Sequence, residues 1–211
     1  MHDADDLHHV LSPWPESLLC APRLHKLYID FHDAEASAFI RKLGVTEDLP
    51  QIQDLTLKHG RIEERYIQTF LQHLQKSLRA LSLHNICLGH HGGGSLVRAA
   101  FVDDAPNLRS ISILKISDDT LDPSRLFYDF PAFLQASFAQ SALRKQCRLT
   151  GSHIDDTHSI NVPCVLGVQY SGPFMREIQS KIRTGRTVRI IGLHKLDDES
   201  LGGSRVSTIG T

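Results

Sequence analysis

A glycine-rich run in the middle of the chain is the first place where chemistry could reside. The run His91-Gly92-Gly93-Gly94 matches the element whose backbone amides form the oxyanion hole of lipases and esterases. Those enzymes carry their nucleophilic serine in a G-x-S-x-G turn, and without a nucleophile the oxyanion hole has no intermediate to stabilise. No G-x-S-x-G turn occurs in the sequence. We therefore expect no catalytic residue and no enzyme, and keep a hydrolase that uses the 91–94 turn as an alternative.

Side chains that could bind a metal ion gather around the same run. His84, Cys87, His90 and His91 supply imidazole and thiolate groups, which are good zinc ligands. Their spacing fits no standard zinc site, and the four cysteines of the chain form no C-x-x-C pair. The sequence therefore predicts no metal site, no cofactor and reduced thiols.

A basic stretch near the C-terminus could contact nucleic acid. Lys181, Arg183, Arg186 and Arg189 offer charges for phosphate groups. No aromatic residue is interleaved to stack on a base, and cations also suit a helix end because of its dipole. The formal net charge of −1 gives no overall attraction to nucleic acid or anionic lipid. A nucleic-acid-binding module that uses residues 181–189 remains an alternative, but neither nucleic acid nor a membrane is the expected partner.

A recurring aliphatic spacing predicts the elements that position these residues. The pattern L-x-x-L-x-L, with Ile in place of Leu at some positions, occurs four times at intervals of 28, 26 and 30 residues. These intervals are close to the period of leucine-rich repeats, in which each unit holds one strand and one helix. Apolar residues with helical spacing predict helices over residues 34–43, 63–76 and 131–143. The four patterns begin at Leu24, Ile52, Leu78 and Leu108.

The repeats predict an α/β fold in the form of a leucine-rich-repeat-like solenoid. We expect about four to five strand-helix units, with a parallel sheet on the inner face and helices outside. The solenoid should be right-handed, because strand-helix-strand crossovers nearly always are. The predicted segments are a lead-in or cap over residues 1–23, the repeat units over 24–145, an irregular strand-helix-strand unit over 146–196 and a flexible tail over 197–211.

Side chains between the aliphatic ones should form rows on the inner face. Alternate residues of a strand point to opposite faces, and parallel stacking places Lys26 beside Asp54 and Asp30 beside Lys58, with opposite charges in both pairs. Partners of solenoids usually bind the inner curve. The residues expected to bind another protein are therefore Tyr28, Asp30, Asp54, Thr56, Lys58, Ser82, His84 and Ser112.

The absence of long apolar runs and the sequence of the first residues indicate the cellular compartment. No run approaches 18 apolar residues, and the first residues, MHDADDLHHV, lack the basic start and apolar core of a signal peptide. Hydrophobic residues make up 41% of the chain, which is ordinary for a globular protein. We expect an intracellular protein, cytoplasmic or nuclear.

Three repeat units also resemble a known family. The segments IQDLTLKHGRI, SLRALSLHNICLGHHGGGSL and NLRSISILKI resemble the leucine-rich-repeat-like C-terminal regions of filamentous-fungal F-box proteins. The segment QYSGPFMREI is similar to a closing segment of that group, so the resemblance spans residues 24–190. In that family the F-box recruits a cullin-type ubiquitin ligase through an adaptor, and the repeats are taken to hold the substrate.

The resemblance implies a non-catalytic scaffold for protein-protein interaction. The chain would correspond to the substrate-binding repeat region of an F-box-type ubiquitin ligase receptor. Only 23 residues precede Leu24, which is too few for an F-box. Ligase components are therefore expected as partners only if a longer form carries that domain.

Overall fold

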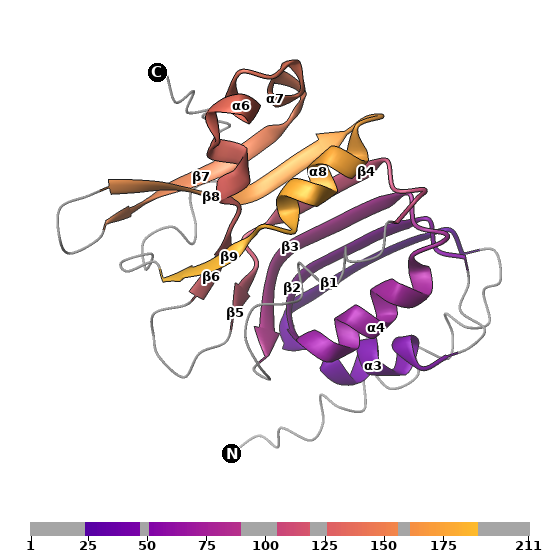
Figure 1. Cartoon of the computed structure of the whole chain (residues 1–211). Coiled ribbons are helices and arrows are strands. Elements are labelled where there is room, and N and C mark those ends of the chain that lie inside the picture. The colour runs from indigo at the N-terminus through magenta and orange to yellow at the C-terminus, as the bar shows by residue number, and fades with distance from the viewer. Residues whose placement is uncertain (1–23, 47–50, 90–104, 119–125, 156–160, 190–211) are drawn as a thin grey trace.

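A single mixed β-sheet organises the protein. The computed structural model describes residues 24–46, 51–89, 105–118, 126–155 and 161–189, and within these ranges nine strands join in one sheet (Figure 1). The strands in chain order are β1 (Lys26–Glu35), β2 (Asp54–Glu63), β3 (Ala80–Gly89), β4 (Ser110–Leu114), β5 (Ser117–Asp118), β6 (Leu126–Asp129), β7 (Arg148–Asp155), β8 (Asn161–Ser171) and β9 (Arg186–Arg189).

The first four strands stack in the predicted register. β1 pairs with β2, β2 with β3 and β3 with β4, all in parallel. One row across these strands consists of Leu27, Leu55, Leu81 and Ile111, and all four side chains are buried. The aliphatic spacing is explained by this row, because every second residue of each strand faces the core.

The strands β1, β2 and β3 each contain one residue with a left-handed backbone, and a further one directly follows β4. The φ angles are 49° at His32, 47° at His59, 53° at Asn85 and 50° at Lys115. A left-handed residue lets two consecutive side chains face the same side before the alternation resumes. In β2, for example, Lys58 and His59 are both partly exposed, although they are consecutive in the strand.

Beyond β3 the sheet divides into two branches, and the predicted solenoid is wrong. β3 pairs in parallel with β4 along its first half and with β5 along its second half. β4 then pairs with β8 and β8 with β7, while β5 pairs with β6 and β6 with β9; these four pairings are all antiparallel. A solenoid needs a parallel strand after every helix, and this chain reverses direction after β4 and β5.

The segment that follows the parallel strands also differs from the prediction. The helix predicted over residues 131–143 is divided into the 3-10 helix η1 (Pro131–Leu134) and the short helices α6 (Ala136–Ala139) and α7 (Ala142–Gln146). Gln135 and Ser141 separate them with extended ψ angles of 140° and 149°.

The predicted strand near residue 165 is β8, which lies inside the sheet where it pairs with both β4 and β7. Its Pro163 lies beyond the part that pairs with β4, so its missing N–H removes no bond from that pairing.

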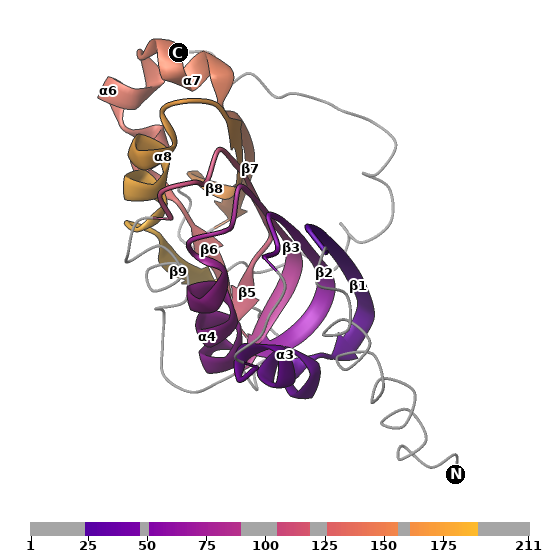
Figure 2. The same cartoon turned by 90° about the vertical axis from the view of Figure 1, so that its right-hand side faces the viewer.

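Helices cover one side of the sheet. α3 (Ser37–Gly44), α4 (Glu64–Leu74) and α8 (Met175–Ile182) lie on the same side of the strands (Figure 2). α4 buries Ile67, Phe70, Leu71 and Leu74, as its spacing predicts. α3 begins later than expected, because Ala34 and Glu35 still pair with β2. None of the helices in the described ranges is long and apolar enough to cross a membrane.

Candidate protein-binding face

The sheet surface that faces away from the buried rows forms a polar face six strands wide. It is built, in spatial order, by β1, β2, β3, β4, β8 and β7. We call this surface the outer face. Its central row consists of Tyr28, Thr56, Ser82, Ser112, Gln169 and Arg148.

All eight residues predicted from the sequence lie on this face in the expected register. Two further rows flank the central one and contain the charged residues of the prediction. Opposite charges meet at Lys26 and Asp54, where Nζ and Oδ2 are 3.2 Å apart. The flanking rows are Lys26, Asp54, Ala80 and Ser110 on one side, and Asp30, Lys58, His84 and Leu114 on the other. The binding role of these residues stays a prediction.

An aromatic ring and a cation form the most prominent contact of the outer face. Tyr28 is 62% exposed, an unusual fraction for a large side chain in a sheet. The Lys58 ammonium lies 5.2 Å from the centre of its ring. Both groups remain accessible, so a partner can cover the ring while the cation stays in place.

Asp30 ties the bends of β1 and β2 together. Its carboxylate accepts a hydrogen bond of 3.1 Å from the His32 N–H. His59 Nδ1 lies 3.1 Å from each of its two oxygens. Burial acts to raise the pKa of Asp30, but the His32 amide and the His59 imidazole outweigh it and hold the pKa below its usual value. The carboxylate is therefore ionised at neutral pH.

His84 and Ser112 form a second polar pair. His84 Nε2 and Ser112 Oγ are 2.7 Å apart. Burial lowers the pKa of His84, and the charges of Lys58 and His59 lower it further, so the imidazole is neutral at pH 7. A serine-histidine pair suits nucleophilic catalysis when a carboxylate orients the base. Within the described residues no carboxylate contacts His84, and Asp30 is bound by His59. The pair therefore contributes a titratable polar group to the surface.

Sequence reasoning missed three residues of this face. His59 is absent from the prediction because the left-handed bend turns it to the same side as Lys58. Gln169 and Arg148 were missed because β8 and β7 extend the face in the antiparallel direction. The alternation of apolar residues around Gln169 does indicate which side that residue faces, but not which strand lies next to it.

The other chemical hypotheses gain little from the structure. The 91–94 turn and His90 lie outside the described residues. In the described ranges no group of three or more His, Cys, Asp or Glu side chains is placed to hold a metal ion. In the basic stretch, the Lys181 ammonium lies 4.9 Å from the centre of the Phe138 ring, and Arg186 and Arg189 belong to β9.

Comparison of the chain with protein-family models, with curated proteins and with solved structures gave no match.

Proposed function

We propose that the protein is a non-catalytic interaction module whose outer face binds another protein. The observation that carries this proposal is the exposed Tyr28 ring beside Lys58 at the β1 edge of a polar sheet face. Tyrosine is among the residues that most often dominate the binding energy of an interface. Two pairs of polar side chains on the same face are already hydrogen-bonded, namely Asp30 with His59 and His84 with Ser112. Less side-chain freedom is therefore lost when a partner docks.

The size of the outer face sets the expected strength of binding. Six strands spaced about 4.8 Å apart set the width of the outer face, and five residues along each strand, with a rise of about 3.3 Å per residue, set its height. The product is a projected area of about 400 Å². A standard interface buries about 800 Å² on each partner. We therefore expect a transient complex, unless the partner also contacts neighbouring elements. An assay for the partner must capture short-lived complexes.

The resemblance to F-box proteins supports a partner class for this face. In that family the corresponding region is taken to hold the substrate of a ubiquitin ligase, so we propose such a substrate as the partner. Recruitment of the ligase itself would need an F-box in a longer form. Recovery of ligase adaptor subunits together with the chain would support that second step.

Site-specific photo-crosslinking in cells that naturally produce the protein tests the proposal. We would place p-benzoylphenylalanine at Tyr28 in the full chain and, as a matched control, at Tyr66, a partly exposed tyrosine on α4. A specific crosslinked protein from position 28 and none from position 66 is the expected result. Lys58→Glu should abolish that crosslink, because it reverses the charge beside the ring. Equal crosslinking from both positions, or none from position 28, would refute the outer face as the binding surface.

A further inference from the structure

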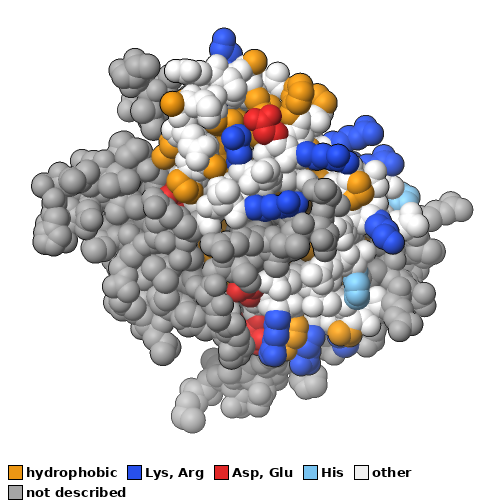
Figure 3. All heavy atoms as spheres, in the orientation of Figure 1, with side chains coloured by type: hydrophobic (Ala, Val, Ile, Leu, Met, Phe, Trp, Pro, Cys, Tyr) orange, Lys and Arg blue, Asp and Glu red, His pale blue; other side chains and the backbone are white. Residues whose placement is uncertain are grey.

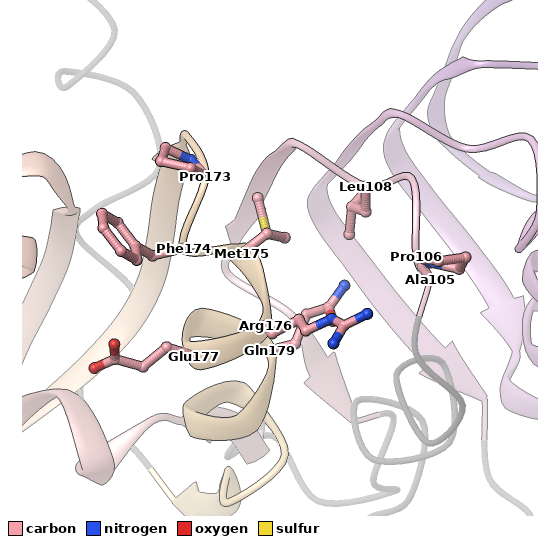
Figure 4. Close-up of a pocket in the computed structure, with 9 residues that line it drawn as sticks. All are labelled: Ala105, Pro106, Leu108, Pro173, Phe174, Met175, Arg176, Glu177 and Gln179. Carbon is pink, nitrogen blue, oxygen red and sulfur yellow. The ribbon is translucent and has the colours of Figure 1, made fainter.

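A pocket of about 350 Å³ lies on the helix side of the sheet (Figure 4). It is formed by the first turn of α8 and by the segment that leads into β4. The close-up shows that Arg176 and Gln179 project from α8 toward the side on which Ala105, Pro106 and Leu108 lie. The pocket is therefore separate from the outer face and uses different residues.

Gln179 is one of the residues that line this pocket, and its carboxamide atoms are buried. The residue is only 1% exposed. Neither its Nε2 nor its Oε1 has a hydrogen-bond partner in the described part of the chain. Buried polar side-chain atoms are nearly always paired, so two unpaired atoms on one side chain require an explanation. A ligand that both accepts and donates a hydrogen bond would satisfy both atoms.

The first turn of α8 adds unpaired donors at the same place. Phe174 provides no side-chain cap, although its own N–H donates to the Tyr170 hydroxyl at 3.1 Å. Within the described residues no acceptor is found for the next two backbone N–H groups, those of Met175 and Arg176. Such groups at a helix start attract anions. Glu177 also lines the pocket, and its carboxylate points to the side opposite Arg176 in Figure 4.

The charged residues that line the pocket are Arg176 and Glu177. Arg176 lines the pocket, and in the described ranges no carboxylate pairs with it. Arg109 directly follows Leu108 and is exposed, and its N–H donates to the Arg79 carbonyl at 2.8 Å. Figure 3 shows basic side chains in the region of α8 and the start of β4, with an acidic side chain among them. The Arg176 guanidinium therefore favours a negatively charged group on its side of the pocket.

We propose that this pocket binds the C-terminal residue of a partner polypeptide. The terminal carboxylate would accept hydrogen bonds from the Met175 and Arg176 amides and pair with the Arg176 guanidinium. The last peptide group offers one N–H and one carbonyl, which match Gln179 Oε1 and Nε2. An apolar last side chain would pack against Leu108 and Met175. An isolated carboxylate lacks this combination of acceptor and donor, because it would leave Oε1 unpaired.

An array of seven-residue peptides with free C-termini, varied at the last two positions, tests the proposal with the full chain. The same sequences with C-terminal amides serve as the matched probe. We expect retention by free carboxylates that follow an apolar residue, and at least about tenfold weaker binding of the amides, because a charge-assisted contact is lost. Arg176→Gln and Gln179→Leu should each weaken binding to a similar degree. Lys145→Gln, which removes an exposed charge on α7, should leave binding unchanged.

A thermal melt separates loss of binding from loss of folding. Gln179→Leu replaces an amide that has no hydrogen-bond partner in the described part of the chain with an apolar side chain of similar size. The melting temperature should therefore stay equal or rise. The proposal is overturned by equal binding of free and amidated peptides, by retention of no peptide, or by a peptide affinity that Gln179→Leu leaves intact. A lower melting temperature for Gln179→Leu would show that the amide is already satisfied, and would likewise overturn it. The result does not depend on the outer face, so Lys58→Glu should not change peptide binding.

Discussion

Replacing Asp129 tests how the two branches of the sheet are held together. Asp129 ends β6 in one branch and is fully buried, with 0% of its surface exposed. Its Oδ1 accepts a hydrogen bond of 2.8 Å from the N–H of Val165, which lies in β8 of the other branch. The next residue, Phe130, donates its own N–H to the Val165 carbonyl at 3.0 Å. Both polar backbone groups of Val165 are therefore bound by one corner of the chain.

The expected loss follows from the group that is left unpaired. Asp129→Ala removes the acceptor and leaves the buried Val165 N–H without a partner, which costs about 1–3 kcal/mol. The free energy of unfolding of a domain is about 5–15 kcal/mol, so the effect should be large. Asp129→Asn keeps an oxygen acceptor for the Val165 N–H and should therefore lose less stability than Asp129→Ala.

Urea unfolding followed by far-ultraviolet circular dichroism measures these differences. The matched control is Asp54→Ala, because Asp54 forms an exposed ion pair with Lys26 on the outer face, and removal of such a pair changes stability by about 0–1 kcal/mol. The reasoning is refuted if Asp129→Ala destabilises the protein no more than Asp54→Ala does. It also fails if the Ala and Asn variants unfold at the same urea concentration, because the acceptor oxygen would then be irrelevant.

Three further outcomes are expected. Lys115→Gly should raise the free energy of unfolding by about 0.5–1 kcal/mol, because glycine adopts a positive φ without steric strain, whereas Asn85→Gly should change it less; equal effects in urea titrations would contradict this. Because the pKa of His84 is lower in the folded state, the unfolded state takes up more protons just below pH 6.5. Stability should therefore fall as the pH drops through that window, and His84→Gln should reduce the slope. Burial raises the pKa of Cys147 to about 11, so peptide mapping after iodoacetamide treatment at pH 8 should show Cys87 labelled and Cys147 protected.

The parallel half of the sheet could be predicted because one signal determines several of its properties. The spacing of Leu55 and Leu57, repeated at Leu81 and Leu83, fixes the strands, their buried side and their register at once. Eight residues of the outer face followed directly from that register. The bends were not predictable in the same way, because the left-handed positions are occupied by His, Asn and Lys instead of glycine.

The antiparallel half could not be predicted from spacing. The alternation in β8 indicates a strand and its buried side, but the period is the same whether the neighbouring strand runs parallel or antiparallel. The segment from Pro131 to Leu143 has helical spacing, yet extended backbone at Gln135 and Ser141 divides it. The polar contact between Asp129 and Val165 depends on residues 36 positions apart. The repeat intervals contain no information about such a contact.

The reversed direction of β8 limits how the chain can vary in length. β4 has β3 on one side and the antiparallel β8 on the other, so no additional strand-helix unit can be inserted after the fourth strand without displacing β8. On the opposite side, among the described strands β1 pairs only with β2. Gain or loss of a whole unit is compatible with the hydrogen bonding only ahead of β4, where consecutive units share one register. Proteins with this architecture should therefore differ in unit number at their N-terminal end and keep a constant C-terminal half.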